Sequence, residues 1–234
     1  MIEPDNKYTQ MQLNHYNNEA ARWSEQNVEP VVGNFHNHNK WVDYENLFTR
    51  LHNQSELIGL DFGCGPGRNV VNYKGRFKRL DGVDISPVNI EKAIQYASNN
   101  GLDSIFYVCN GTDLDIINDN EYDFVMSTIA LQHICVHQIR YSIMKDVYRV
   151  LKEGGLFTAQ MGYGPKVPRK NSVDYYDNFW DAGKTNGGCD TRVESPSQLE
   201  DDLIAIGFKD FEYKILQTGP GDDHPNWIYF SCVK

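Results

Sequence analysis

The segment LDFGCGPGR at residues 60–68 limits the fold of this 234-residue chain more than any other stretch. It places Gly63, Gly65 and Gly67 directly after the short apolar run at residues 56–62 and before a helix. Glycines at such a turn let a ligand come close to the backbone, and the N-terminus of the following helix offers free N–H groups. The segment therefore predicts a strand–turn–helix unit that carries a ligand site in an α/β fold.

Short apolar runs alternate with helical patterns through the centre of the chain. Pro87 and Gly101 mark the two ends of one helix, and Gly154 and Gly155 follow a second. Strands that alternate with helices predict a mostly parallel sheet covered on both faces. The expected strands are 56–62, 80–86, 104–110, 122–128, 156–162, 209–217 and 226–234, and the expected helices after the turn are 87–101, 137–155 and 195–208.

Two regions fall outside this alternation. Residues 1–54 are polar, with helical candidates at 6–26 and 40–53, and they predict a helical cap in front of a domain at 55–234. Residues 163–193 are rich in Gly, Asn, Asp and aromatic side chains and show little periodicity. Loops of this length are uncommon in compact domains unless they are functional, so we expect a lid-like insertion there.

Two carboxylates accompany the glycine turn. Asp61 stands two residues before Gly63, where it would repel a pyrophosphate but would suit an ammonium group. Asp84 ends the next strand, at the place where an acidic side chain accepts hydrogen bonds from two ribose hydroxyls. Arg68 occupies the position at which the dinucleotide fingerprint has its third glycine. The pattern favours a nucleoside with a cationic tail and no phosphate, a description that S-adenosylmethionine fits.

Through these motifs the chain resembles the class I S-adenosylmethionine-dependent methyltransferases over residues 55–162. DFGCGPG at 61–67 resembles their first motif, and GVDIS at 82–86 resembles the second. The resemblance implies a doubly wound, mostly parallel seven-stranded sheet with an antiparallel last strand. It also implies an enzyme of the small-molecule type that uses S-adenosylmethionine.

The resemblance further implies where the cofactor is held. Asp61 and the glycines would hold its methionine end, and Asp84 its ribose. Asn110 stands where many members have an acidic residue near the adenine. The full set of expected cofactor contacts is Asp61, Gly63, Cys64, Gly65, Gly67, Arg68, Asp84, Ile85, Ser86, Asn110, Gly111, Thr112 and Ile129.

Methyl transfer to a hydroxyl group benefits from a general base, and His133 is the candidate. It follows the expected strand at 122–128, at the carboxyl edge where ligands of open α/β sheets bind, and an imidazole titrates in a useful range. A histidine that only packs against the cofactor remains the alternative. Aromatic side chains mixed with polar groups suit a small polar acceptor, methylated preferentially at oxygen. The candidate acceptor contacts are Tyr16, His38, Tyr163, Trp180 and Arg192.

Composition narrows the class of partner. A formal charge of −10 weighs against nucleic acid, and no run approaches the ~20 apolar residues of a membrane helix. The N-terminus lacks a signal-peptide pattern, and five cysteines without a CxxC pair suit a reducing cytoplasm. Asp222, Asp223 and His224 admit a metal site, but no companion ligand stands at a diagnostic spacing, so we expect none.

Three further questions stay open from the sequence. The closing strands and the aromatic insertion could support a homodimer. A nicotinamide-dependent oxidoreductase remains an alternative activity for a glycine-rich turn of this kind. A protein that binds S-adenosylmethionine without catalysis, acting as a scaffold, is the third possibility.

Overall fold

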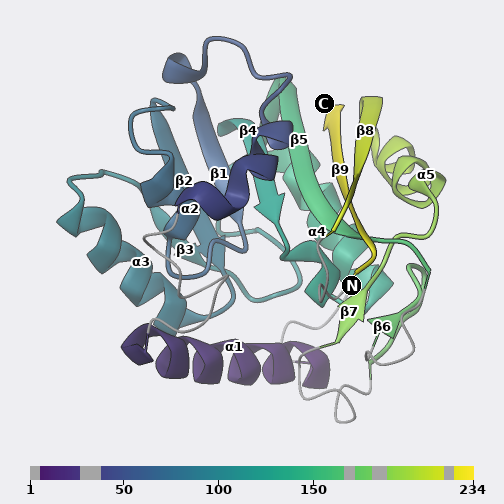
Figure 1. Ribbon diagram of the computed structural model, residues 1–234, viewed down its shortest axis with the longest axis horizontal. Helices are drawn as coiled ribbons and strands as arrows, with labels where there is room; N and C mark the ends of the chain where they lie inside the picture. The colour runs from purple at the N-terminus through teal and green to yellow at the C-terminus, as the bar shows by residue number, and fades with distance from the viewer. Residues whose placement is uncertain (1–5, 27–37, 166–171, 181–188, 219–223) are drawn as a thin grey trace.

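A seven-stranded sheet forms the centre of the computed structural model, which describes residues 6–26, 38–165, 172–180, 189–218 and 224–234 (Figure 1). The strand order is β3-β2-β1-β4-β5-β9-β8. The neighbours from β3 to β5 are parallel, whereas β9 runs antiparallel to both β5 and β8. The strands are β1 Ile58–Phe62, β2 Arg79–Asp84, β3 Phe106–Val108, β4 Tyr122–Thr128, β5 Leu151–Tyr163, β8 Lys209–Gln217 and β9 Asn226–Val233.

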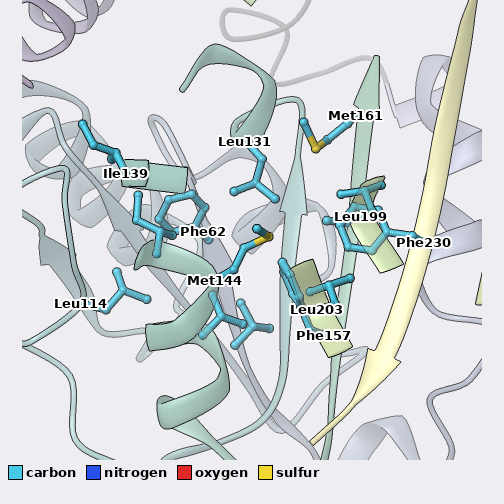
Figure 2. Close-up of a cluster of buried hydrophobic side chains, with 14 of the residues drawn as sticks. Phe62, Leu114, Leu131, Ile139, Met144, Phe157, Met161, Leu199, Leu203 and Phe230 are labelled. Carbon is cyan, nitrogen blue, oxygen red and sulfur yellow. The ribbon is translucent and has the colours of Figure 1, made fainter. Parts of the chain in front are cut away.

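This sheet confirms the fold class expected from the sequence, including the antiparallel last strand. Consecutive residues of β4 show that both faces are covered, because Val125 packs into one hydrophobic cluster while Phe124 and Met126 pack into another. Figure 2 shows the cluster that contains Val125, in which the helix residues Met144 and Leu199 lie beside residues of the strands. The helices are α1 Lys7–Gln26, α2 Arg68–Asn72, α3 Pro87–Asn99, α4 His137–Val150 and α5 Pro196–Ile206, with 3-10 helices η1 His38–Leu47, η2 Gln54–Glu56 and η3 Leu131–His133.

Local chemistry sets where the two best-predicted helices begin. The Ser86 hydroxyl accepts a hydrogen bond from the Asn89 N–H at 3.1 Å, and Pro87 occupies the first turn of α3. At the start of α5 the Gln198 side chain accepts from the Ser195 N–H at 3.2 Å, which is one half of a capping box. Each cap satisfies a backbone group that the helix itself leaves without a partner.

Two expected helices differ from the structure. The helix predicted at 137–155 ends at Val150, because Leu151 pairs with Tyr122 and starts β5. Lys152, which falls within that predicted helix, extends from β5 instead, and its Nζ lies 2.8 Å from Oδ1 of Asp123. The segment predicted as a helix at 40–53 contains the 3-10 helix η1 instead.

The region expected as an insertion contains a second, small sheet. Strands β6 Ser172–Val173 and β7 Asp190–Thr191 pair in parallel. The chain after β7 is joined to the main sheet, because the Val193 N–H donates to the Gly162 carbonyl at 3.0 Å. The division into a cap at 1–54 and a domain at 55–234 remains a prediction.

Among the residues that the structure describes, no helix combines the length and the apolar character that a membrane span requires.

Candidate functional site

A hollow lies at the carboxyl ends of β1, β2 and β4, with an empty volume of about 1060 Å³. Phe62, Asp84 and Thr128, the last residues of these three strands, all line it. Helix α1 forms its remaining wall and runs along the lower side of the molecule in Figure 1. Ligands of open α/β sheets bind at this edge.

The glycine turn adopts a backbone that few other residues tolerate. Gly63, Gly65 and Gly67 have φ angles of 74°, 52° and 83°. At Gly63 a Cβ atom would also lie 2.2 Å from the Cβ of Ala130, on the far side of the turn. Gly63 therefore requires glycine both for conformation and for close approach of the chain, whereas Gly65, where a Cβ would meet no atom within 4 Å, requires it for conformation alone.

The carboxylate of Asp84 holds this turn and faces the hollow. One oxygen accepts from the Gly65 N–H at 2.9 Å and the other from the Ser86 N–H at 2.8 Å. Burial raises the pKa of Asp84, although the two N–H groups favour its ionised form. A carboxylate has about four lone-pair sites, so acceptor capacity remains for a ligand.

Asp61 is fully buried below the same turn. Its Oδ2 accepts from the Asn69 side chain at 3.2 Å, but its Oδ1 has no hydrogen-bond partner among the described residues. Burial raises the pKa of the Asp61 carboxyl to about 7, against the opposing influence of Asn69 and of Arg68, which lines the hollow. A buried oxygen without a partner is costly, so a donor or cation from a ligand would be stabilised there.

His133 in η3 faces the hollow and contacts a carboxylate from the small sheet. Its Nδ1 lies 2.6 Å from Oδ1 of Asp190 on β7. The other oxygen of Asp190 lies 3.2 Å from Nε2 of His224. Burial alone would raise the pKa of Asp190, but the two imidazoles outweigh it and hold that pKa well below its usual range.

Helix α1 is attached to both sides of the hollow. The Tyr8 hydroxyl accepts from the Cys135 N–H at 2.6 Å and donates to the His133 carbonyl at 3.0 Å. On the other side, the Ser86 hydroxyl donates to the Asn17 side chain at 2.6 Å. Tyr16 lies between these attachments, with its ring centroid 6.2 Å from that of His133.

We expect that Tyr8→Phe will loosen α1 from the hollow. The substitution keeps the ring but leaves the buried Cys135 N–H without its acceptor, at a cost of about 1–3 kcal/mol. Hydrogen exchange of the α1 amides should accelerate, while exchange in β1 and β4 stays unchanged. Tyr213→Phe on the exposed face of β8 is the control, and equal α1 exchange in both variants would contradict this attachment.

Most of the cofactor contacts expected from the sequence lie on the wall of the hollow. Five are displaced from it: Gly67 turns the chain into α2, Ser86 caps α3, Asp61 lies underneath, and Asn110 and Thr112 flank Gly111. The residues on the wall are Gly63, Cys64, Gly65, Arg68, Asp84, Ile85, Gly111 and Ile129, together with Tyr16 and His133.

The loop after β3 presents Gly111 to the hollow rather than the side chains beside it. The Asn110 side chain is exposed and accepts from the Thr112 N–H at 2.8 Å, which closes a tight turn. Gly111 has φ 83°, and a Cβ there would lie 2.5 Å from the Ile85 side chain. Asn110 and Thr112 therefore shape this wall without lining it.

Three of the expected acceptor contacts lie outside the hollow. Arg192 pairs with Asp174 at 2.6 Å and with Glu194 at 2.8 Å, which fixes the small sheet. Trp180 is exposed, and the Tyr163 backbone bridges to Val193. The side chain of His38 lies outside the described residues, as do Asp222 and Asp223.

Sequence reasoning assigned Tyr16, but not Tyr8 and Gln12 on the same face of α1, nor the contact of Asp190 on β7 with His133. Tyr8, Gln12 and Tyr16 line the hollow at intervals of four residues, a helical spacing that could have marked this face of α1. Asp190 is separated from His133 by more than fifty residues, and no local pattern joins the two.

Comparison with known proteins gives the domain and the fold. Residues 60–155 match the family model described as "Methyltransferase domain". The ribosomal protein L11 methyltransferase of Clostridium botulinum is 36% identical over 98 residues, which cover 42% of this chain and 29% of that protein. Squalene methyltransferase 1 of Botryococcus braunii is 28% identical over 179 residues, covering 73% and 44%. The chain thus spans less than half the length of these relatives.

Solved structures extend the likeness over nearly the whole chain. Phosphoethanolamine N-methyltransferase 2 of Haemonchus contortus in complex with S-adenosyl-L-methionine has a TM-score of 0.65 at 17% identity, covering 94% of this chain and 60% of that one. The methyltransferase solved with the Haloferax volcanii Trm112 activator has a TM-score of 0.62 at 17% identity, covering 94% and 96%. At such identities the likeness establishes the fold.

Proposed function

We propose that this chain, which matches a methyltransferase domain over residues 60–155 and has the fold of S-adenosylmethionine-dependent methyltransferases, methylates a small polar acceptor, at oxygen, in the hollow beside α1. The observation that carries this proposal is the pair of buried carboxylates, Asp61 and Asp84, on either side of the glycine turn. Asp61 near the end of β1 would suit an ammonium group of the ligand, and Asp84 at the end of β2 would suit its ribose. The cofactor is S-adenosylmethionine.

The residues of the hollow fit that cofactor. The unpartnered oxygen of Asp61 would accept from its ammonium group, and the Arg68 guanidinium would face its carboxylate. Asp84 would accept from the ribose hydroxyls, and Ile85 with Gly111 would pack against the adenine. When bound, the cofactor supplies an activated methyl group, whose carbon bonds to the acceptor oxygen as its bond to the sulfonium sulfur breaks and S-adenosylhomocysteine is left.

His133 would accept the proton that the acceptor hydroxyl loses. Its side chain lies on the wall of the hollow, and Nδ1 lies 2.6 Å from Oδ1 of Asp190, so Nε2 would remain for the acceptor. Tyr16 and Ile134 on the same wall would exclude water from the reacting atoms. The chain's own contribution is therefore to bind, orient and hold a proton, which suffices when the methyl group is already activated.

Further observations support the proposed class of acceptor, the cellular location and a homodimer. Squalene methyltransferase and the sterol 24-C-methyltransferase of Gibberella zeae, 31% identical over 102 residues, are named for small molecules. The formal charge of −10 disfavours nucleic acid as the substrate. All five cysteines are free thiols, which suits a reducing cytoplasm. The edge strand β8, with Tyr213 exposed, could join two copies in a homodimer.

Calorimetric titration with S-adenosylmethionine tests the proposal, and the pH dependence identifies Asp61. We expect binding that releases a proton below pH 7, because the cofactor ammonium favours the ionised form of a carboxyl whose pKa is about 7. Affinity should rise with pH up to about 7 and fall again near pH 8, where an α-amino group loses its charge.

In the ligand-free protein the pH dependence of folding stability has the opposite sign to the pH dependence of cofactor affinity. Because the folded pKa of Asp61 lies above its unfolded value, folding stability from this group falls as pH rises from the usual carboxyl range to about 7. Asp61→Asn should abolish both dependences, whereas Asp103→Asn in an exposed loop should preserve them. Absence of binding at every pH would refute the proposed function.

A further inference from the structure

A single carboxylate in this protein lies between two imidazoles. Asp190 contacts His133 through one oxygen at 2.6 Å and His224 through the other at 3.2 Å. The three residues come from different parts of the fold: η3, β7 and the start of the segment that leads into β9. Their meeting is a product of the tertiary structure, and it lies directly behind the hollow.

The position of Asp190 is fixed by the strand that carries it. The hydroxyl of Thr191 donates to the Asp174 carbonyl at 3.2 Å, and Val193 exchanges backbone hydrogen bonds with Gly162 and Gly164 at 3.0 and 2.9 Å. Arg192 clamps the same strand through its two carboxylate partners, Asp174 and Glu194. A carboxylate held on so many sides can orient another side chain.

His224 is fixed as firmly on the other side. It is only 4% exposed, and its ring lies against Gly162, where a Cβ atom would come within 2.2 Å of Nδ1. Its ring centroid lies 5.2 Å from that of Trp227. Its Nε2 is thereby directed at Asp190, which prevents that carboxylate from rotating away from His133.

The other neighbours of His133 come from α1. Tyr8 and Gln12 donate to its main-chain carbonyl at 3.0 and 3.2 Å, and Tyr16 presents its ring. Burial raises the pKa of the Tyr16 hydroxyl, with further contributions from Tyr8 and Asp190, so this neighbour stays uncharged. Asp190 is the carboxylate in direct contact with the imidazole.

We propose that Asp190, held by His224, is a positioning residue that fixes His133 as its Nδ1–H tautomer and leaves the Nε2 lone pair for the hollow. The inference rests on the proposed function for its purpose, and it narrows the acceptor to one whose attacking atom has both a lone pair and a removable proton, as a hydroxyl does. As that atom bonds to the methyl carbon, its proton moves to Nε2, and the imidazolium that forms is paired with ionised Asp190. No proton needs to reach Asp190 itself.

Nitrogen NMR of the histidine side chains tests the tautomer without any turnover. Long-range ¹H–¹⁵N spectra of the labelled full chain, at a pH where imidazole is neutral, distinguish a protonated from an unprotonated ring nitrogen, and His133→Gln identifies the signals. We expect His133 to carry its proton on Nδ1, although a free neutral histidine favours Nε2. In Asp190→Asn the population should shift toward the Nε2–H form, since an amide can donate to Nδ1.

Asp201→Asn is the matched control, because it makes the same change at an exposed position of α5, outside the groups that hold Asp190 and His133. A wild-type spectrum with the proton on Nε2 would overturn the inference, as would a folded Asp190→Asn with the wild-type pattern. If Asp190→Asn does not fold, the wild-type spectrum still decides. Titration with S-adenosylmethionine is read separately: an Nδ1–H histidine in a chain that binds no cofactor keeps this inference and refutes the proposed function.

Discussion

Replacing Asp84 with alanine should lower the affinity for S-adenosylmethionine by about 100-fold, the largest effect expected of any single change in the hollow. The side chain would lose two charge-assisted hydrogen bonds to the ribose, each worth roughly 1.5–3 kcal/mol. It would also release the Gly65 and Ser86 N–H groups that its oxygens now fix at 2.9 and 2.8 Å. Isothermal titration calorimetry measures the loss directly.

The control for this experiment is an aspartate of equal size on the surface. Asp103 lies in the exposed loop before β3, and Asp103→Ala should bind the cofactor as the wild type does. The affinity of Asp84→Asn for the cofactor should fall between those of Asp84→Ala and Asp103→Ala, because the amide keeps one acceptor oxygen. Wild-type affinity in a folded Asp84→Ala would place the ribose elsewhere and contradict the arrangement proposed for the cofactor.

Replacing Arg140 with alanine should lower the free energy of unfolding by about 3 kcal/mol or more. This side chain is fully buried in α4, donates to the carbonyls of Ile134 and Tyr175, and lies 4.6 Å from the Tyr175 ring centroid. Alanine would leave both carbonyl groups without their hydrogen-bond donor and would create a cavity. Urea denaturation of the variant beside Lys145→Ala, an exposed residue of the same helix, measures the difference.

Arg140 also links the two halves of the proposed catalytic apparatus. Ile134 directly follows His133, and Tyr175 belongs to the segment after β6 that leads toward the small sheet. We therefore expect Arg140→Ala to lose stability without losing its fold class, with the segments around η3 and β6 exchanging hydrogen fastest. Equal stability of the two variants would show that the buried guanidinium contributes little.

Much of the fold could be predicted because its signals are local. The glycine turn, Pro87 at the start of α3 and Ser195 before α5 each announce a boundary within a few residues. The boundary at Leu151 could not be found this way, because its apolar side chain fits a helix as well as a strand. Pairing with Tyr122 decides in favour of β5, and that partner lies far away in sequence.

Local sequence signals also predict one part of the candidate site, whereas the other part depends on residues far apart in the sequence. Asp61 and Asp84 belong to motifs whose spacing places them near the ends of neighbouring strands, so Asp84 on the wall of the hollow and Asp61 buried beneath it could be anticipated. His133 could be placed at the right edge for the same reason. Its partner Asp190 comes from a segment of low periodicity, and Trp180, which looked equally suitable there, faces solvent.

The origin of the residues around the hollow bears on how such a protein could diversify. The end that would hold the cofactor is made by one continuous stretch from β1 to the start of α3, whereas Asp190 and His224 come from the connections that follow β5. Exchange of those connections could therefore change which molecules are methylated while leaving the nucleoside end intact. A chimaera that carries the β5–β9 connections of a relative would inherit the relative's acceptor preference together with this chain's affinity for the nucleoside.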